Sequence, residues 1–320
     1  MILKNLCSLI GVSGYEKIVT DYLYSLISSE NLCDKIYKDE IENLICLQKG
    51  SDKIEKKKNI VICAHADEVG FQIIKKLDKE RYAVKNLGSI KTWNAVGQLV
   101  KSNNAQGLIQ ALNYQNLQAN NFNNLFLTSV NGGNNIKIGD VFTFDRPFIN
   151  GEKYFFGKSL DNRASCYCLY KLIKAKIKTL ADIFYVFTVQ EETTMRGIRV
   201  IKTTLKPDLL INLDLSPENE MNSVKTGGGI AIKISDSLGF SSLKYVNLAE
   251  EIAVKNKIKF QFEVSDCGTS ELIISNELDF GKSEIGFSLP CRNIHTSNSM
   301  IFKKDLTSAI KFLKKFLSIF

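Results

Sequence analysis

Long apolar runs are missing from this chain, and so is any sign of a secretory leader. The longest runs, IFYVFTV and LLINL, have the length of strands, whereas a membrane helix needs about 20 apolar residues. The amino terminus, MILKNLCSLIGVSGYE, has no charged leader followed by a long apolar region and a small-residue cleavage site. We therefore expect a cytoplasmic protein with no membrane partner.

Closely paired cysteines are also missing. The eight cysteines form no C-x-x-C motif, which is the spacing that zinc ribbons and thiol redox motifs need. We expect them to be reduced packing residues, as is usual in cytosolic proteins. They stand at Cys7, Cys33, Cys46, Cys63, Cys166, Cys168, Cys267 and Cys291.

Acidic charge is in deficit, because 34 Asp and Glu face 42 Lys and Arg and leave a net charge of +8. Such an excess invites a nucleic-acid hypothesis. The basic residues are mostly isolated lysines, however, and the one tight run, Lys56 to Lys58, precedes a predicted strand as a solvated loop would. Zinc-finger spacing, a helix-turn-helix signature and an aromatic RNA-binding motif are absent, so we expect no nucleic-acid partner.

The pattern of apolar residues indicates an α/β fold. At 44% hydrophobic residues, a chain of this length can bury a large core. A capping-box pattern, S-x-x-E at Ser13 and Glu16, opens an amphipathic helix. Short apolar strands then alternate with helices, which predicts a mostly parallel-stranded sheet flanked by helices. The expected strands cover 59–64, 183–189, 208–214, 259–264 and 284–290, and the expected helices 161–177, 196–205, 241–256 and 305–320.

The texture of the sequence changes between residues 70 and 156. Apolar runs become short and alternating, with turn signals at Gly88 and Gly139. We predict a small β-barrel-like domain of residues 70–156, inserted into a catalytic domain of residues 1–69 and 157–320. From Arg81 through Gly139 there is no Asp or Glu, so the insert is locally cationic.

Histidine is almost absent, and both copies stand just past predicted strands. His65 follows NIVICA, and His295 follows GFSLPCRNI. Because the carboxyl ends of parallel strands open on one crevice, residues at these ends converge there. Acidic residues also follow the predicted strands, namely Asp67, Glu68, Glu191, Glu192 and Asp214. Asp161 opens the predicted helix that begins with DNR.

Two imidazoles and several carboxylates at one place predict a site for two metal ions. Such a cluster needs positive charge to offset its repulsion. A carboxylate can bridge two ions held roughly 3.5 to 4 Å apart, and such a pair activates a shared water. We predict that Asp161 is the bridge, with His65 and Asp214 on one ion and Glu192 and His295 on the other.

Two further acids have predicted roles beside the ions. Glu191, adjacent to Glu192, is the expected general base. Asp67 is expected to accept the other N–H of His65 and so to fix its tautomer. Taken alone, each piece also fits an ordinary role, because glutamate pairs are usually solvated and Asp214 before a Ser-Pro sequence fits a turn. Together, in this order and at the ends of predicted strands, the two histidines and the acids favour a site for two metal ions.

These segments resemble family 42 of the metallopeptidases, which includes glutamyl, deblocking and TET-type aminopeptidases and proteins labelled cellulase M or endoglucanase. The resemblance spans essentially the whole chain, through the motifs AHADEVGF, GKSLDNRAS, QEETTMRG, INLDLS and NIHTS. It implies a zinc-peptidase-like fold, two divalent ions per subunit, with zinc or cobalt as the expected metals, and the same ligands and base. The ligands it implies are His65, Asp161, Glu192, Asp214 and His295, with Glu191 as the base and Asp67 behind His65.

The position of the insert fits family 42 better than it fits the related carboxypeptidase-like and deacylase families. Carboxypeptidase-like and deacylase families carry their extra domain before the last histidine, where the interval from Asp214 to His295 is too short for one. Family 42 carries it between the first histidine and the bridging aspartate, here His65 and Asp161. The family uses that domain to form dimers, so the resemblance implies a homo-oligomer in which dimers build up to a larger particle such as a dodecamer.

Two positions depart from the family. Ser270, in GTSE, stands where the family usually has the acid of TDA, and Ser299 stands where a glutamate is typical. Neither position is a ligand, so the departures bear on substrate selection and dimer contacts rather than on hydrolysis.

We therefore expect a metalloaminopeptidase that removes the amino-terminal residue of peptides. A catalytically silent assembly or binding protein with the same fold is the main alternative, and a related di-metal carboxypeptidase or deacylase is another. Endoglucanase activity fits poorly, because glycoside cleavage uses two carboxylates without histidine-bound metal, and Trp93 is the only tryptophan. The preferred residue stays open, although the cationic insert suggests acidic peptides.

Overall fold

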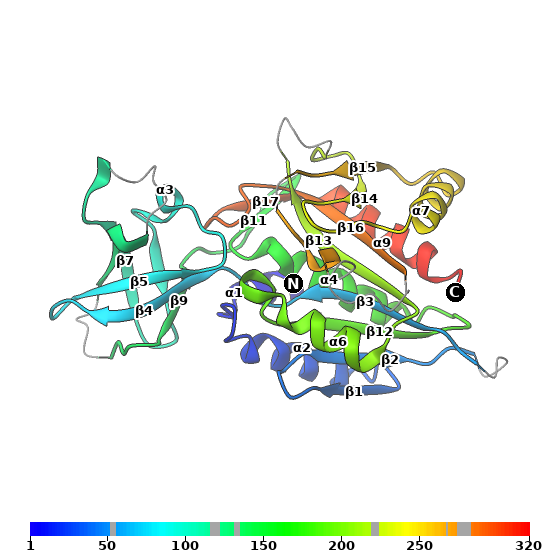
Figure 1. Cartoon of the computed structure of the whole chain (residues 1–320), viewed down its shortest axis with the longest axis horizontal. Coiled ribbons are helices and arrows are strands. Elements are labelled where there is room, and N and C mark those ends of the chain that lie inside the picture. Colours follow the sequence, from blue (N-terminus) through cyan, green and yellow to red (C-terminus); the bar gives the residue numbers. More distant parts are fainter. Residues whose placement is uncertain (52–55, 116–121, 131–134, 219–223, 267, 274–282) are drawn as a thin grey trace.

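The protein has two lobes, a large α/β body and a smaller β lobe at one end (Figure 1). The computed structural model describes residues 1–51, 56–115, 122–130, 135–218, 224–266, 268–273 and 283–320. Cys267, one of the predicted reduced cysteines, lies outside these residues. The other cysteines are free thiols, and all of them except Cys33 are buried. Among the described helices, none has the length and apolar character to cross a membrane.

Four parallel strands form the centre of the large sheet. They are adjacent in the order β12 (Asp182–Thr188), β3 (Asn59–His65), β13 (Leu209–Pro217) and β16 (Ser283–Arg292). Each is a short, largely buried apolar run, as the sequence predicts. Their shared direction puts their carboxyl ends at the same edge of the sheet.

Antiparallel strands extend the sheet on both sides of this parallel centre. One side continues through β2 (Leu44–Gln48) and β1 (Lys35–Lys38). The other continues through β17 (Ser299–Phe302), β11 (Tyr154–Gly157) and β10 (Ile149–Asn150). A branch of the sheet leaves β16, where β14 (Ile230–Ser235) pairs antiparallel with β16 and parallel with β15 (Phe260–Val264).

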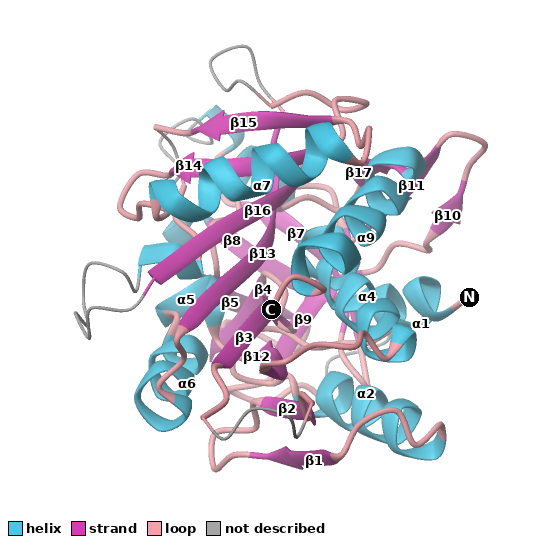
Figure 2. Ribbon diagram, turned by 90° about the vertical axis from the view of Figure 1, so that its right-hand side faces the viewer, coloured by secondary structure: helices cyan, strands magenta, loops and turns pink. Residues whose placement is uncertain are grey.

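Helices cover both faces of the sheet (Figure 2). Side chains of β3 alternate between the two, so Ile60 and Ile62 belong to one apolar core and Val61 and Cys63 to the other. The first core lies under α1 (Ile2–Ser8), α2 (Lys17–Ser29), α4 (Leu160–Ala175), α7 (Leu243–Lys255) and α9 (Lys303–Leu317), and the second lies under α6 (Arg196–Leu205), which follows the single-turn α5 (Glu191–Thr194).

The predicted capping box before α2 is wrong, although the helix is present. Glu16 Oε1 accepts a hydrogen bond from the backbone N–H of Gln190 at 2.8 Å, and the Ser13 and Thr193 hydroxyls are 2.9 Å apart. Neither side chain caps α2. Both side chains instead tie the amino-terminal segment to the residues around α5.

The small lobe is a closed six-stranded barrel, as the texture of the sequence predicts. Its strands follow the order β4 (Gly70–Lys76), β5 (Arg81–Leu87), β8 (Leu125–Ser129), β7 (Gln106–Ala111), β6 (Leu99–Lys101) and β9 (Val141–Phe144), with α3 (Thr92–Ala95) and the short η2 (Phe122–Asn124) beside them. Buried aromatic residues fill it, with Phe71 edge-on to Phe144 at 5.5 Å between ring centroids. The barrel ends at Phe144, and residues 149–157, most of which were assigned to the insert, pair with the large sheet.

A buried ionic network lies where the barrel meets the larger lobe. Lys158 Nζ donates to both carboxylate oxygens of Glu68, at 2.8 and 2.7 Å. The same carboxylate accepts hydrogen bonds from the backbone N–H of Gly11 and from the hydroxyl of Thr143 on β9. Arg163 Nη2 is 3.5 Å from it. One carboxylate therefore joins the amino-terminal segment, the barrel and the start of α4.

Lys158→Met is expected to lower the free energy of unfolding by about 3–5 kcal/mol, because it leaves the buried Glu68 carboxylate without its main partner. Urea denaturation followed by circular dichroism measures this. The matched control is Lys153→Met, which removes an exposed lysine a few residues earlier and should change stability by less than about 0.5 kcal/mol. A loss below about 1 kcal/mol for Lys158→Met would contradict a structural role for the network.

Candidate metal centre

The carboxyl edge of the parallel strands gathers the predicted site residues. Each reaches this edge from a different segment: His65 ends β3, Glu191 and Glu192 open α5 after β12, Asp214 lies near the end of β13, Asp161 lies in the first turn of α4, and His295 lies between β16 and β17. All of the acids except Glu192 are more than nine-tenths buried. The topology of the sheet therefore brings together residues that are as far apart in the sequence as His65 and His295.

Asp161 lies between the two histidines. Its Oδ1 is 3.3 Å from His65 Nε2, and its Oδ2 is 3.1 Å from His295 Nε2. Each imidazole also faces a second carboxylate, since His65 Nε2 is 3.5 Å from Asp214 Oδ1 and His295 Nε2 is 3.3 Å from Glu192 Oε2. Two histidine–carboxylate groups therefore meet at one shared aspartate.

Glu191 lies close to one of these groups. Its Oε2 is 3.8 Å from His65 Nε2, farther than the nearest oxygens of Asp161 and Asp214. Ligand atoms of His65, Glu191 and Asp214 all lie within 4.8 Å of one another, and so do those of His65, Asp161 and Glu192. The Glu191 carboxylate therefore belongs to the cluster, at a slightly greater distance from His65 than Asp161 and Asp214.

Asp67 connects the two strand ends from behind. Its Oδ1 is 3.4 Å from His65 Nδ1, the imidazole atom that faces away from the cluster. The two carboxylate oxygens also accept hydrogen bonds from the backbone N–H groups of Glu191 and Glu192, at 3.1 and 3.0 Å. The first turn of a helix has free N–H groups, and an acid there satisfies them. Asp67 therefore bonds to the backbone of both glutamates and lies beside His65.

The pKa values of His65 and Glu191 are raised, because the cluster is acidic and buried. Burial by itself lowers the pKa of His65, but the carboxylates of Glu191, Asp161 and Asp214 together raise it well above its ordinary value. Burial, reinforced by Asp214 and Glu192, raises the pKa of Glu191 well above its ordinary value. Such a site stabilises added positive charge, which a divalent ion supplies by displacing the protons.

The donor set fits divalent metal ions. Asp161 Oδ1 and Glu192 Oε1 are buried and have no hydrogen-bond partner among the described residues. Native proteins rarely leave such atoms unpartnered unless an ion or water binds them. Imidazole and carboxylate ligands suit zinc, cobalt and manganese.

A cleft of about 440 Å³ opens from the cluster. His65, Asp161, Glu191, Asp214 and His295 line one part of it, together with Glu192. The other part is lined by residues that the sequence analysis did not single out, among them Lys233, Asp236 and Glu263, and by Ser270. The cleft therefore joins the cluster to these further polar residues.

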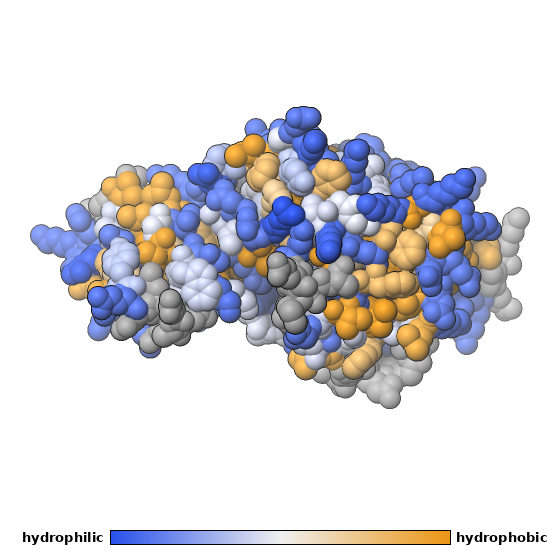
Figure 3. All heavy atoms as spheres, turned by 90° about the horizontal axis from the view of Figure 1, so that it is seen from above, coloured by the Kyte–Doolittle hydropathy of each residue, from blue (hydrophilic) through white to orange (hydrophobic). Residues whose placement is uncertain are grey.

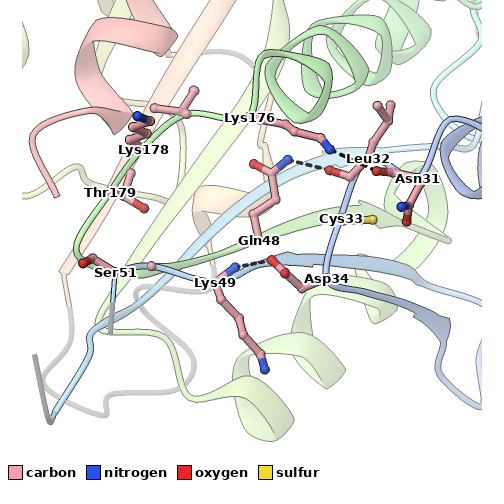
Figure 4. Close-up of a pocket in the computed structure, with 12 residues that line it drawn as sticks. Asn31, Leu32, Cys33, Asp34, Gln48, Lys49, Ser51, Lys176, Lys178 and Thr179 are labelled. Carbon is pink, nitrogen blue, oxygen red and sulfur yellow. Dashed lines mark hydrogen bonds between the residues drawn. The ribbon is translucent and has the colours of Figure 1, made fainter. Parts of the chain in front are cut away.

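A second cavity, of about 570 Å³, contains none of the predicted ligands (Figure 4). Its polar groups bond to the chain itself, since the Gln48 amide donates to the carbonyl of Leu32 at 2.9 Å and Lys176 Nζ donates to that of Asn31 at 3.1 Å. The lysines that line it are exposed. It offers no buried acid or imidazole for catalysis.

Both departures from the family pattern lie near the cleft or the cluster. The Ser270 hydroxyl and backbone N–H both donate to Asp236 Oδ2, at 2.7 and 3.0 Å. The Ser299 hydroxyl donates to the carbonyl of Asn293, in the loop that carries His295, at 3.0 Å. Both serines thus support loops beside the site.

A model of the M42 glutamyl aminopeptidase family matches residues 42–312 of the chain. The chain belongs to this family. It is therefore a metal-dependent aminopeptidase, a hydrolase of peptide bonds, and the predicted resemblance is confirmed. A relative from Acetivibrio thermocellus that is provisionally named an aminopeptidase is 31% identical, with 98% of this chain and 96% of the relative covered.

Solved structures share the fold over almost the whole chain. The aminopeptidase APDkam598 of the archaeon Desulfurococcus kamchatkensis has a TM-score of 0.90 at 26% identity, and the match covers 99% of this chain and 93% of that one. The dodecameric PhTET1 has a TM-score of 0.86 at 22% identity, with 98% and 97% covered, which shows likeness of fold. The α/β body with an inserted barrel is thus the fold expected for the family.

The metal-free protein is expected to lose stability as pH rises from about 5 to 7. Burial raises the pKa of Glu16 and of Glu271 to about 7, and the pKa values of Glu191 and His65 are also raised, so the folded state binds more protons than the unfolded state. The free energy of unfolding then falls with increasing pH. Added zinc should replace protons at the cluster and flatten this slope. Urea denaturation at several pH values, with chelator or with zinc, measures both slopes; equal slopes would contradict metal binding at the cluster.

Proposed function

We propose that the cluster binds two divalent ions. Asp161 would be shared by both ions, His65 and Asp214 would hold one of them, and Glu192 and His295 would hold the other. The observation that carries this assignment is the position of Asp161, with one carboxylate oxygen within 3.3 Å of each imidazole. Zinc or cobalt suits these ligands. When bound, such ions polarise the scissile carbonyl and lower the pKa of a bound water.

Glu191 is the general base in this proposal. It lines the cleft, is buried, and lies farther from His65 than the carboxylates that we assign as ligands. Burial and the neighbouring carboxylates raise its pKa above the ordinary value, which strengthens it as a base that takes a proton from water. It can then donate that proton to the amine of the leaving peptide. Asp67 keeps Glu191 in place through the backbone N–H of that residue.

Hydrolysis of the amino-terminal peptide bond fits this chain better than the alternatives. A silent assembly protein would be expected to have lost a ligand or the base, whereas His65, Asp161, Glu191 and their partners are all present and gathered at one edge. A carboxypeptidase or deacylase would carry its extra domain after Asp214, but the barrel precedes Asp161. We also propose a cytoplasmic location, because the seven cysteines that the structure describes are free thiols.

The barrel is our proposed oligomerisation surface. Several large apolar side chains on this lobe are more than half exposed, among them Trp93, Leu99, Leu112 and Ile138. Part of this surface is visible on the smaller lobe in Figure 3. Exposed apolar patches of this kind often mark protein interfaces. A structural neighbour, PhTET1, forms a dodecamer, which supports a homo-oligomer built from dimers.

Glu191→Gln is expected to keep the metal and lower kcat by about 10²–10⁴-fold, because the amide cannot accept the water proton. Aminoacyl anilides measure turnover, and atomic emission measures metal bound per chain. The control Glu250→Gln alters a glutamate on the helix α7, outside the cleft, and should leave both unchanged. Near-normal turnover by Glu191→Gln would refute the assignment of the base, and wild-type protein that binds metal without turnover would support the silent alternative.

Light scattering is expected to give a mass that is a multiple of the 36.0 kDa chain. Leu99→Lys combined with Leu112→Lys places two charges on the exposed apolar surface of the barrel and should lower that mass, because a desolvated charge opposes association. The control pair places lysines at Leu180 and Ile319, which are exposed on the larger lobe. A monomeric wild type, or equal effects of the two pairs, would contradict the proposed interface.

A further inference from the structure

The part of the cleft beyond the metal cluster has a wall made of two buried carboxylates and one buried lysine. Lys233 on β14 lies directly opposite Glu263 on β15, as Cα partners in parallel strands. Asp236 follows in the turn after β14. Exposure of these residues is 4%, 1% and 6%, and all three line the cleft.

The neighbouring strand makes room for the lysine. Gly286 on β16 is the antiparallel partner of Lys233. A Cβ at Gly286 would come within 3.1 Å of the Lys233 Cβ and Cδ atoms. The lysine stem therefore packs flat over β16, and its ammonium is held in the wall of the cleft.

Both carboxylate oxygens of Asp236 accept hydrogen bonds from the surrounding chain. One of its oxygens accepts hydrogen bonds from the backbone N–H groups of Leu238 and Gly239, at 3.1 and 2.8 Å. The other accepts two hydrogen bonds from Ser270. Asp236 thus has a structural reason to be buried as a carboxylate.

Glu263 has no comparable set of partners. Its Oε1 is 3.5 Å from Lys233 Nζ, and its Oε2 accepts no hydrogen bond from the described residues. A buried carboxylate oxygen without a donor is costly, and a ligand that supplies the donor removes that cost.

The charges of this wall do not cancel. Lys233 Nζ is shared between Glu263 and Asp236, at 3.5 and 3.7 Å, so one ammonium faces two carboxylates. Lys91, the other lysine that lines the cleft, is exposed and comes from the segment between β5 and α3, where solvent screens its charge. The buried wall therefore has a net charge of about −1.

We propose that this wall is the subsite for the side chain of the amino-terminal residue, and that it selects a cationic side chain, that of lysine or arginine, through the free oxygen of Glu263. This proposal rests on the metal-centred function above, because the cluster at the other part of the cleft places the peptide bond. An acidic side chain would meet the unpartnered Glu263 carboxylate, and Lys233 is already engaged. The subsite thus opposes the preference for acidic peptides that the cationic insert suggests.

Calorimetric titration of the metal-loaded protein with L-lysine, L-norleucine and L-glutamate tests the subsite. The three amino acids share their α-amino and α-carboxyl groups, and norleucine has the carbon chain of lysine without its ammonium, so differences in affinity report the side chain. We expect lysine to bind at least about tenfold more tightly than norleucine, which is the size of one charge-assisted hydrogen bond. Glutamate should bind more weakly than norleucine.

Glu263→Gln keeps the shape of the side chain and should remove most of the advantage of lysine over norleucine. The matched control is Asp266→Asn, which removes an exposed negative charge three residues away and should preserve that advantage. Lysine binding no more tightly than norleucine to the wild type would overturn the proposal without any variant. Glutamate binding most tightly, with Lys233→Met removing that binding, would overturn it in favour of an acidic side chain.

Turnover separates failure of the subsite from failure of the proposed function. A wild type that hydrolyses leucyl and lysyl anilides equally well would overturn the subsite and leave the metal centre as the catalyst. A wild type that binds lysine selectively but hydrolyses no aminoacyl substrate would overturn the proposed function and support the subsite as a binding site.

Discussion

The carboxylate of Asp67 is the contact on which the arrangement of the site depends. It lies 3.4 Å from the rear nitrogen of His65 and accepts hydrogen bonds from the backbone of Glu191 and Glu192. α5 has a single turn and cannot satisfy its own first N–H groups. Besides Asp67, the hydrogen bonds of Glu16 to Gln190 and of Ser13 to Thr193 hold this turn. One buried acid thus contacts the predicted ligand at the end of β3 and also the backbone of the predicted base and of the predicted ligand that follow β12.

The following residue extends this constraint to the other lobe. Glu68 turns away from the cluster and bonds to Lys158, and also to Thr143 on the last barrel strand. Lys158 lies three residues before Asp161, so the same network holds the start of α4. The two consecutive acids therefore have different roles. Asp67 contacts the residues at the ends of β3 and β12, and Glu68 joins the barrel to the segment that carries Asp161. The barrel strand β9 and the segment that leads to Asp161 thus share one buried carboxylate.

Local pattern was enough to predict the parallel centre of the sheet, the barrel and the residues that meet at the carboxyl edge. The sheet and most of the site residues need only an apolar strand and the polar residue that follows it, Asp161 needs a helix start, and the barrel needs short alternating runs with glycine turns. Partnerships across the fold were not predictable in this way. Glu16 has the spacing of a capping residue but bonds to Gln190, and the strand that ends at Gly157 joins the large sheet because its partner is β17. The sequence around Glu263 does not predict that Lys233 lies opposite it on the neighbouring strand.

Ser270 shows how a departure from the family pattern can be compensated within the same cleft. Its hydroxyl and its backbone N–H both donate to Asp236, which is 6% exposed. A carboxylate at position 270 would face Asp236 at hydrogen-bond distance, and two buried like charges repel unless one is protonated. Serine avoids that repulsion and donates two hydrogen bonds to Asp236 instead. Asp236 is also 3.7 Å from Lys233 Nζ, which lies 3.5 Å from Glu263, so the serine at position 270 helps to hold one of the two carboxylates that face this lysine in the cleft wall.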